Sequence, residues 1–196
     1  MALRSFSIIV AVDSQMGIGK DNNLPWRLPK EMKHFTRTTS HTTREGCQNA
    51  VIMGRKSWDA IPTKYRPLPN RLNIVLSRSL KQQPDGALLF SNLGEALAHL
   101  GTDTTRREIE NVFVIGGGQL YAEALMSEYC QRVYLTRLNK CFDCDVSLLS
   151  TDAWLPQYVV SSDPNVDQEL QEEKGIQYQI HVYDRQPVAA APVAAS

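Results

Sequence analysis

Glu31 is the residue whose placement most clearly suggests chemistry. In the segment LPKEMKHF, Leu28, Met32 and Phe35 recur at the spacing of one helical face, and Glu31 falls on that same face. A carboxylate there is partly desolvated, which is costly unless something hydrogen-bonds it. Glu31 either lies at the edge of the stripe and reaches water, or acts as a pocket acid that grips an amidine-like ligand group. The preceding glycine-bearing loop, MGIGKDNNLPW, favours the pocket, because such loops often act as lids.

Cations and hydroxyls follow two successive β-branched runs. The run NAVIM ends at Gly54 and is followed by an Arg-Lys-Ser triplet at 55–57, where a short helix should begin, and RLNIVLS ends at Ser77 and Arg78. Each could be a solvated basic turn. Together they favour an anion site, because ligands in open α/β sheets bind outside the carboxyl ends of the strands. A ribose 2′-phosphate would suit these cations, which indicates NADP rather than NAD.

A third candidate is the glycine turn in NVFVIGGGQLY. Glycines at 116–118 between an apolar run and a helix would let a phosphate approach the backbone, although strand–helix turns often use glycine for geometry alone. Tyr121 stands where the G-x-G-x-x-G fingerprint needs its last glycine. A nucleotide site here is therefore not a Rossmann site.

Other catalytic and metal motifs are missing from the sequence. It contains no G-x-S-x-G, H-E-x-x-H or G-x-x-x-x-G-K-[ST]. Cys141 and Cys144 form C-F-D-C, which could be a redox pair or half of a zinc site, but Cys47 and Cys130 stand alone, so we expect ordinary thiols and no metal. The four histidines are expected at the surface rather than as bases: His34, His41, His99 and His181.

Short β-branched runs alternate with helical patterns, which predicts a largely parallel sheet with flanking helices. A last run alternates apolar and polar residues, as an antiparallel edge strand does. The expected strands are 6–12, 49–53, 71–77, 111–115, 132–138 and 176–184. Helices are expected over 29–38 and 119–126, and after Asn92, which forms a capping box with Glu95. The segment GTDTTRREIEN is expected to be a solvated insertion.

Composition limits the class of protein. The 196 residues carry a net charge of +0, so nucleic acid is not expected as the main partner. The apolar run near the N-terminus is too short for a membrane span and has no cleavage site after it, which favours a cytoplasmic protein. We expect one domain over 1–186 and a disordered Ala/Pro tail over 187–196.

Taken in order, these segments resemble the dihydrofolate reductases, with the likeness running from Ser5 to Asp184. The matching blocks are IVAVD, MGIGKDNNLPW, LPKEMKHF, VIMGRKSWDAIP, RPLPNR, LSR, VIGGGQLY, YLTR and EEKGIQYQIHVY. W-R-L-P-K-E looks most like fungal or bacterial members, whereas EEKGI looks more eukaryotic, so the chain resembles a fungal-like or other lower-eukaryotic member. The resemblance implies a single α/β domain with a mostly parallel sheet of about eight strands, an antiparallel C-terminal edge strand and about four flanking helices.

The resemblance also implies roles, position by position. Glu31 would bond the 2-amino group and N3 of a pterin ring, Thr136 would hydrogen-bond Glu31 or a bridging water, and Trp26 and Leu24 would complete the catalytic site. Arg71 would pair with the α-carboxylate of the substrate's glutamate tail. The implied substrate slot consists of Ile9, Val10, Glu31, Met32, Phe35, Ile61, Leu68, Arg71, Ile115 and Thr136. The implied NADPH contacts are Ala11, Ile18, Gly19, Lys20, Gly54, Arg55, Lys56, Ser57, Leu76, Ser77, Arg78, Ile115, Gly116, Gly117, Gly118, Gln119, Leu120 and Tyr121.

Three departures from the family pattern stand out. Met32 replaces the Phe of vertebrate members, Ser57 replaces the commoner Thr, and FDCDVSLLS lacks the usual aromatic-Pro ending. The resemblance further implies a cis peptide between Gly116 and Gly117, NADPH-dependent reduction of dihydrofolate, inhibition by antifolates and a monomer.

Three alternatives stay open. The first is a reductase of another pterin-like or pyrimidine substrate, against which Arg71 argues, because it calls for an anionic tail. The second is a catalytically silent NADP-binding or regulatory module, which would bind the cofactor without consuming it. The third is one half of a fusion with thymidylate synthase, although the tail shows no start of a second domain.

Overall fold

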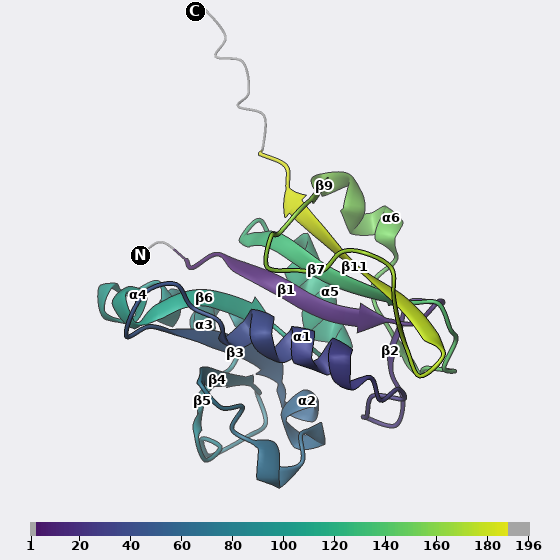
Figure 1. Ribbon diagram of the computed structural model, residues 1–196. Helices are drawn as coiled ribbons and strands as arrows, with labels where there is room; N and C mark the ends of the chain where they lie inside the picture. Colours follow the sequence, from purple (N-terminus) through teal and green to yellow (C-terminus); the bar gives the residue numbers. More distant parts are fainter. Residues whose placement is uncertain (1–2, 188–196) are drawn as a thin grey trace, which may run out of the picture.

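The computed structural model describes residues 3–187 and shows a twisted sheet with helices on both faces (Figure 1). Eight strands follow the order β5-β4-β3-β6-β1-β7-β11-β10, and β9 pairs with β11 off this path. The strands are β1 (Phe6–Val12), β3 (Gln48–Gly54), β4 (Arg71–Leu76), β5 (Ala87–Phe90), β6 (Ile109–Val114), β7 (Cys130–Leu138), β9 (Tyr158–Ser161), β10 (Gln171–Glu173) and β11 (Ile176–Arg185). A two-stranded ribbon is formed by β2 (Gly17–Gly19) and β8 (Val146–Ser147).

The expected mostly parallel α/β sheet is confirmed. Neighbours from β5 to β7 are parallel, while β11 is antiparallel to β7. All six expected strands are present, with bounds that differ by at most two residues. The outer side of β11 is paired with β10 at one end and with β9 at the other. The parallel strands deliver their carboxyl ends to one edge, where β1 has neighbours β6 and β7 on its two sides.

Helices cover both faces of this sheet. They are α1 (Pro29–Ser40), α2 (Arg55–Ala60), α3 (Leu93–Leu100), α4 (Asp103–Glu108), α5 (Gly118–Met126) and α6 (Thr151–Trp154), with short 3-10 turns at Thr63–Tyr65 and Leu155–Gln157. Side chains of α3 and α5 pack with Ile8 and Val10 in one core cluster, whereas Phe35 and Trp58, from α1 and α2, pack with Ile9 in another. Alternate residues of β1 therefore face opposite layers.

The Asn92 cap expected before α3 is confirmed, and Glu95 reaches back to the residue before the cap instead of to the Asn92 N–H. The side chain of Asn92 accepts a hydrogen bond from the Glu95 N–H at 2.9 Å, and Glu95 in turn accepts from the Ser91 N–H at 3.1 Å. Leu93, Leu97 and Leu100 are buried on one face, as their spacing predicts.

The expected buried face of α1 is confirmed at Leu28, Glu31 and Phe35 but is wrong at Met32. Met32 is 43% exposed, whereas Glu31, His34 and Thr39 are buried. Two of these polar groups find partners on the sheet: Thr136 from β7 donates to Glu31 Oε1 at 3.2 Å, and Arg71 from β4 donates to Thr39 Oγ1 at 2.7 Å. His34 is held within the helix, where its Nδ1 lies 3.3 Å from Thr38 Oγ1. His34 is therefore a core residue, not the expected surface residue, and burial lowers its pKa to about 4. His41 and His99 are exposed, and His181 is half-buried.

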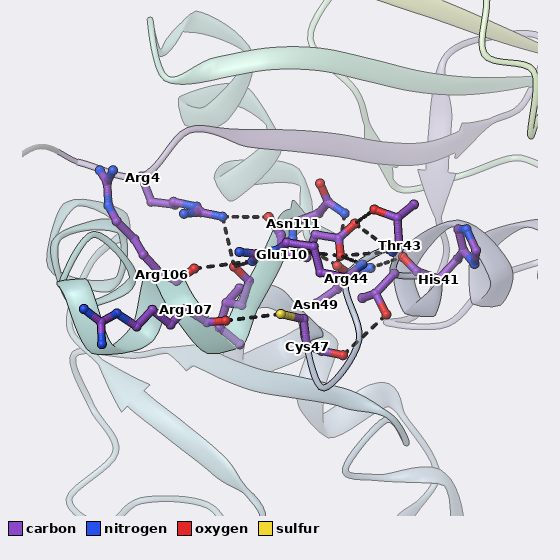
Figure 2. A network of polar contacts seen from close by, with 12 residues as sticks. Arg4, His41, Thr43, Arg44, Cys47, Asn49, Arg106, Arg107, Glu110 and Asn111 are labelled. Atoms are coloured by element: carbon purple, nitrogen blue, oxygen red, sulfur yellow. Dashed lines mark hydrogen bonds and ion pairs between the residues drawn. The ribbon is translucent and has the colours of Figure 1, made fainter.

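The expectation that GTDTTRREIEN is a solvated insertion is also wrong. It forms helix α4 and the start of β6, and Ile109 and Thr105 are buried. Figure 2 shows the polar network that holds this region: the carboxylate of Glu110 accepts from the Thr43 N–H at 2.9 Å and from the Arg44 N–H at 2.7 Å. Burial opposes ionisation of Glu110, but these hydrogen bonds outweigh it and lower its pKa.

Within residues 3–187, no helix is long and apolar enough to cross a membrane. The same residues hold no group of three or more His, Cys, Asp or Glu side chains arranged to bind a metal ion. The four cysteines are free thiols, with Cys141 and Cys144 in the loop after β7. Beyond Pro187, the predicted disordered tail lies outside the described residues.

Candidate active site

Glu31 lies in the first turn of α1 and is only 6% exposed. The hydroxyl of Thr136, from the buried centre of β7, donates to Glu31 Oε1 at 3.2 Å. Burial raises the pKa of Glu31 to about 7, with the Thr136 hydrogen bond opposing the rise and the charge of Glu173 adding to it. A buried carboxyl of this kind can hold or release a proton near neutral pH.

Two buried aromatic side chains belong to this region: Tyr121, which the charge of Glu31 reaches, and Trp26, which precedes α1. Trp26 is buried, and its Nε1 has no hydrogen-bond partner among the described residues. Tyr121, from α5, is buried against β1, and its hydroxyl donates to the Ile9 carbonyl oxygen at 2.9 Å. Burial and the nearby charge of Glu31 raise the Tyr121 pKa, so this phenol stays protonated. Glu31 therefore lies in polar, largely dry surroundings in which Glu173 supplies a nearby negative charge.

The glycine turn after β6 meets the end of β3. The Gly54 N–H donates to the Gly116 carbonyl oxygen at 2.8 Å, and the Gly116–Gly117 peptide is cis, as the resemblance implies. Gly116 has φ +122°, and a Cβ on it would lie 3.3 Å from the Tyr121 ring. A Cβ on Gly117 would lie 3.1 Å from Ser57 Oγ. The turn therefore lies between the ring of Tyr121, which is near Glu31, and the hydroxyl of Ser57 at the start of α2.

The lid segment lies against this glycine turn. A Cβ on Gly118 would lie 2.7 Å from Val146 Cγ1 and 3.6 Å from Ile18 Cδ1, which places Ile18 beside the turn. Asn22 Nδ2 donates to the Lys56 carbonyl oxygen at 3.0 Å, which joins the far end of the lid to α2. Buried Asp13 anchors the near end, where its carboxylate accepts from the Gly17 N–H at 2.8 Å.

The expected cations meet at the carboxyl ends of β3 and β4. Gly54 and Leu76 are register partners, so the side chains that follow each strand emerge side by side. Arg55, Lys56 and Arg78 are exposed, and Arg55 pairs with Asp59 at 3.2 Å on the surface of α2. The sequence expectation that these strands present their basic residues at one edge is met.

The residues expected in the substrate slot, the catalytic site and the cofactor site are only partly gathered. Phe35, Ile61, Leu68 and Ile115 are partly buried around the cluster that contains Ile9. Val10 does not join them, because its side chain packs in the cluster on the other face. Leu120 and Leu76 also pack in that other cluster, and Ala11 packs near Trp26. Leu24 and Met32 face solvent, with 49% and 43% of their surface exposed. Gly19 is half-buried in the lid, and Lys20 and Gln119 are exposed.

Arg71 is a buried cation at the start of β4. It is 7% exposed, its Nη1 donates to Thr39 Oγ1 at 2.7 Å and its Nε donates to the Pro69 carbonyl oxygen at 3.0 Å. No carboxylate among the described residues forms an ion pair with it. Burial lowers its pKa. A buried guanidinium held only by neutral oxygens is suited to an anionic ligand group.

Three residues that support the site were not found from the sequence. Thr39 orients Arg71, Asp13 anchors the lid, and Glu173 lies near Glu31. Thr39 and Glu173 act across large sequence separations, so no local pattern marks them. Asp13 directly precedes the lid, and an Asp before a glycine-bearing loop is a signal that could have been used.

Replacing Thr136 with Val should raise the pKa of Glu31 further. The substitution keeps the side-chain shape but removes the one hydroxyl that donates to Glu31, and that bond favours the ionised form. A pH titration of Glu31 by carboxyl NMR would measure the change. The control is Thr38→Val, on α1 with Glu31, which leaves the hydrogen bond between Thr136 and Glu31 intact. An unchanged or lower pKa would contradict the role given to Thr136.

The sheet, the basic residues at its carboxyl edge, the buried carboxyl and the glycine turn define an α/β protein with a ligand site outside its strand ends, built differently from a Rossmann site. The family model for dihydrofolate reductase matches residues 5–185. A chicken (Gallus gallus) dihydrofolate reductase is 43% identical over 95% of this chain and 100% of its own length. One from Aedes albopictus is 41% identical over 94% and 100%. The solved Schistosoma mansoni enzyme matches with a TM-score of 0.81 at 32% identity, covering 94% of this chain and all of that one. The chain belongs to the dihydrofolate reductase family.

Proposed function

We propose that the protein reduces 7,8-dihydrofolate to 5,6,7,8-tetrahydrofolate with NADPH, and so supplies one-carbon units for thymidylate and purine synthesis. The observation that carries this proposal is the buried Glu31 carboxyl, held by Thr136 and titrating near neutral pH. Such a group suits the 2-amino group and N3 of a pterin, because together these present two donors to one carboxylate.

The residues at the carboxyl edge fit NADPH. A Cβ on Gly117 or Gly118 would come within 3.1 Å or 2.7 Å of its neighbours, so these positions keep the backbone open to close approach. Arg55, Lys56 and Arg78 supply positive charge for phosphates, with Ser57 and Ser77 adjacent. When bound, NADPH would supply the hydride for C6 of the pterin.

The chain's own residues orient the ring and control the proton. Glu31 would fix the pterin through its 2-amino side and stabilise positive charge at N5. N5 lies on the far side of the ring, so a water would donate its proton directly. The lid around Ile18, anchored by Asp13 and by the Asn22–Lys56 bond, would exclude bulk water.

NADPH should be consumed when dihydrofolate is added, and NADH should be a much poorer donor. A 2′-phosphate contact to an arginine contributes about 1.5–3 kcal/mol, or at least a tenfold preference. Loss of absorbance with each donor measures this, and Arg55→Gln and Arg78→Gln should reduce the preference. Lys64→Gln, on an exposed turn elsewhere, is the control. NADPH binding without consumption would instead support the silent regulatory module.

Inhibitors, oligomeric state and cellular location follow from the same proposal. Antifolates with a protonatable amidine-like group should bind at Glu31 for the same reason as the pterin. We expect the enzyme to act as a monomer in the cytoplasm.

A further inference from the structure

The hairpin between β10 and β11 is joined to the first turn of α1, although 143 residues separate the contacting positions. Lys174 and Gly175 form its two-residue turn with positive φ values of +52° and +73°. Lys174 Nζ donates to the Arg27 carbonyl oxygen at 3.0 Å, and the side chain of Glu173 reaches the start of α1. The hairpin therefore contacts the segment immediately before Glu31.

Glu173 supplies the cap that α1 lacks locally. The residue before the helix is Leu28, which offers no side-chain acceptor, and Pro29 is the first helical residue. The backbone N–H of Lys30 would then have no intrahelical partner. Glu173 Oε2 accepts from this N–H at 2.9 Å, so a carboxylate from a distant strand occupies the helix N-terminus, where negative charge is favourable.

The charge of Glu173 also reaches Glu31. Thr136 from β7, Tyr121 from α5 and Tyr178 from β11 surround Glu31 from the other elements, and all three are neutral. On α1 itself, Lys30 and Lys33 are exposed to solvent. Among the residues that act on the Glu31 carboxyl from the elements packed around it, Glu173 is therefore the charged one. Its negative charge favours the protonated form of Glu31.

We infer that Glu173 is a positioning residue for Glu31: through the Lys30 N–H it fixes the backbone beside Glu31, and through its negative charge it helps Glu31 keep a proton. This deepens the proposed function, because Glu31 is the group assigned to the pterin. Neighbouring Glu172 is exposed and bonds to nothing on α1 among the described residues, so it provides a matched control.

Two substitutions separate the two effects of Glu173. Glu173→Gln keeps an oxygen acceptor for Lys30 but removes the charge, whereas Glu173→Ala removes both. In Glu173→Gln, the pKa of Glu31 should fall from about 7 by roughly half a pH unit. The dihydrofolate KM should stay near that of the wild type. In Glu173→Ala, the pKa of Glu31 should fall in the same way. The dihydrofolate KM should in addition rise by about fivefold, the factor that corresponds to the free energy of one helix cap.

The primary measurement is a carboxyl NMR titration of Glu31 in the protein without substrate, with the resonance assigned by its loss in Glu31→Gln. The pH profile of kcat/KM is the second measurement. Added salt should shrink the difference between Glu173→Gln and the wild type, and Glu172→Gln should titrate like the wild type. An unchanged Glu31 pKa in folded Glu173→Gln, or an equal shift in Glu172→Gln, would overturn the inference. If the wild type fails to reduce dihydrofolate, the proposed function falls, but the titration still decides the role of Glu173.

Discussion

Replacing Glu31 with Gln should lower turnover of dihydrofolate at pH 7 by about 10²- to 10⁴-fold, the range for loss of an acid–base group. Gln fills the same volume and can still accept the Thr136 hydrogen bond, so the fold should persist. It cannot carry the negative charge that we propose binds the pterin and stabilises positive charge at N5. Steady-state assays across pH would measure the loss.

NADPH affinity is the control for this variant. The cations at the ends of β3 and β4 do not depend on Glu31, so the dissociation constant, measured by fluorescence titration, should stay within about twofold, a free-energy change smaller than one ordinary hydrogen bond. Near-wild-type turnover in Glu31→Gln would remove Glu31 from the mechanism. Loss of both turnover and cofactor binding would point to misfolding instead.

The same variant should change how stability depends on pH. The folded pKa of Glu31, about 7, lies above its ordinary value of 4.5, so its contribution to stability is fully present below pH 4.5. That contribution is lost as the pH rises through 7, and amounts to about 3 kcal/mol. Denaturant unfolding should therefore show that, from pH 5 to pH 8, the free energy of unfolding of the wild type falls relative to that of Glu31→Gln.

The sequence predicted the central strands and the glycine turn well because their signals are local. Runs such as 6–12 and 71–77 are long, apolar and β-branched, and the glycines at 116–118 follow such a run directly. The short strands β5, β9 and β10 were not predicted. They have three or four residues each and gain their stability from pairing with β4 or β11, which no local pattern reveals.

The prediction for α1 failed at Met32 and His34 for a related physical reason. Periodicity placed Leu28, Glu31, Met32 and Phe35 on the buried face, but Met32 is exposed, and the helix also buries His34 and Thr39. Glu31 and Thr39 can be buried because tertiary partners satisfy them, namely Thr136 on β7 and Arg71 on β4. His34 contacts only Thr38 of its own helix, and its buried Nε2 has no hydrogen-bond partner among the described residues. The resemblance predicted Glu31 as a site residue and its hydrogen bond with Thr136, whereas the Arg71–Thr39 contact and the position of Glu173 came only from the structure.

Arg71 should carry the recognition of the anionic tail of the substrate. Replacing it with Gln should raise the KM for dihydrofolate by about 100-fold, as expected when one partner of a buried charged pair is removed. Lys should restore only part of the affinity, because a single ammonium cannot form the bidentate pair of a guanidinium. Steady-state kinetics of the three proteins would measure this series.

A tail-less dihydropterin makes the test specific, because it presents the same ring to Glu31 and nothing to Arg71. With this substrate, wild type and Arg71→Gln should have similar kcat/KM values, so the penalty should depend on the tail alone. Thr39→Val provides a matched variant: it removes the hydroxyl that holds Nη1 at 2.7 Å but keeps the cation, and should give a smaller, still tail-dependent loss. Equal penalties with both substrates would show that Arg71 acts on the fold. A wild type that prefers the tail-less compound would favour a reductase of a different pterin.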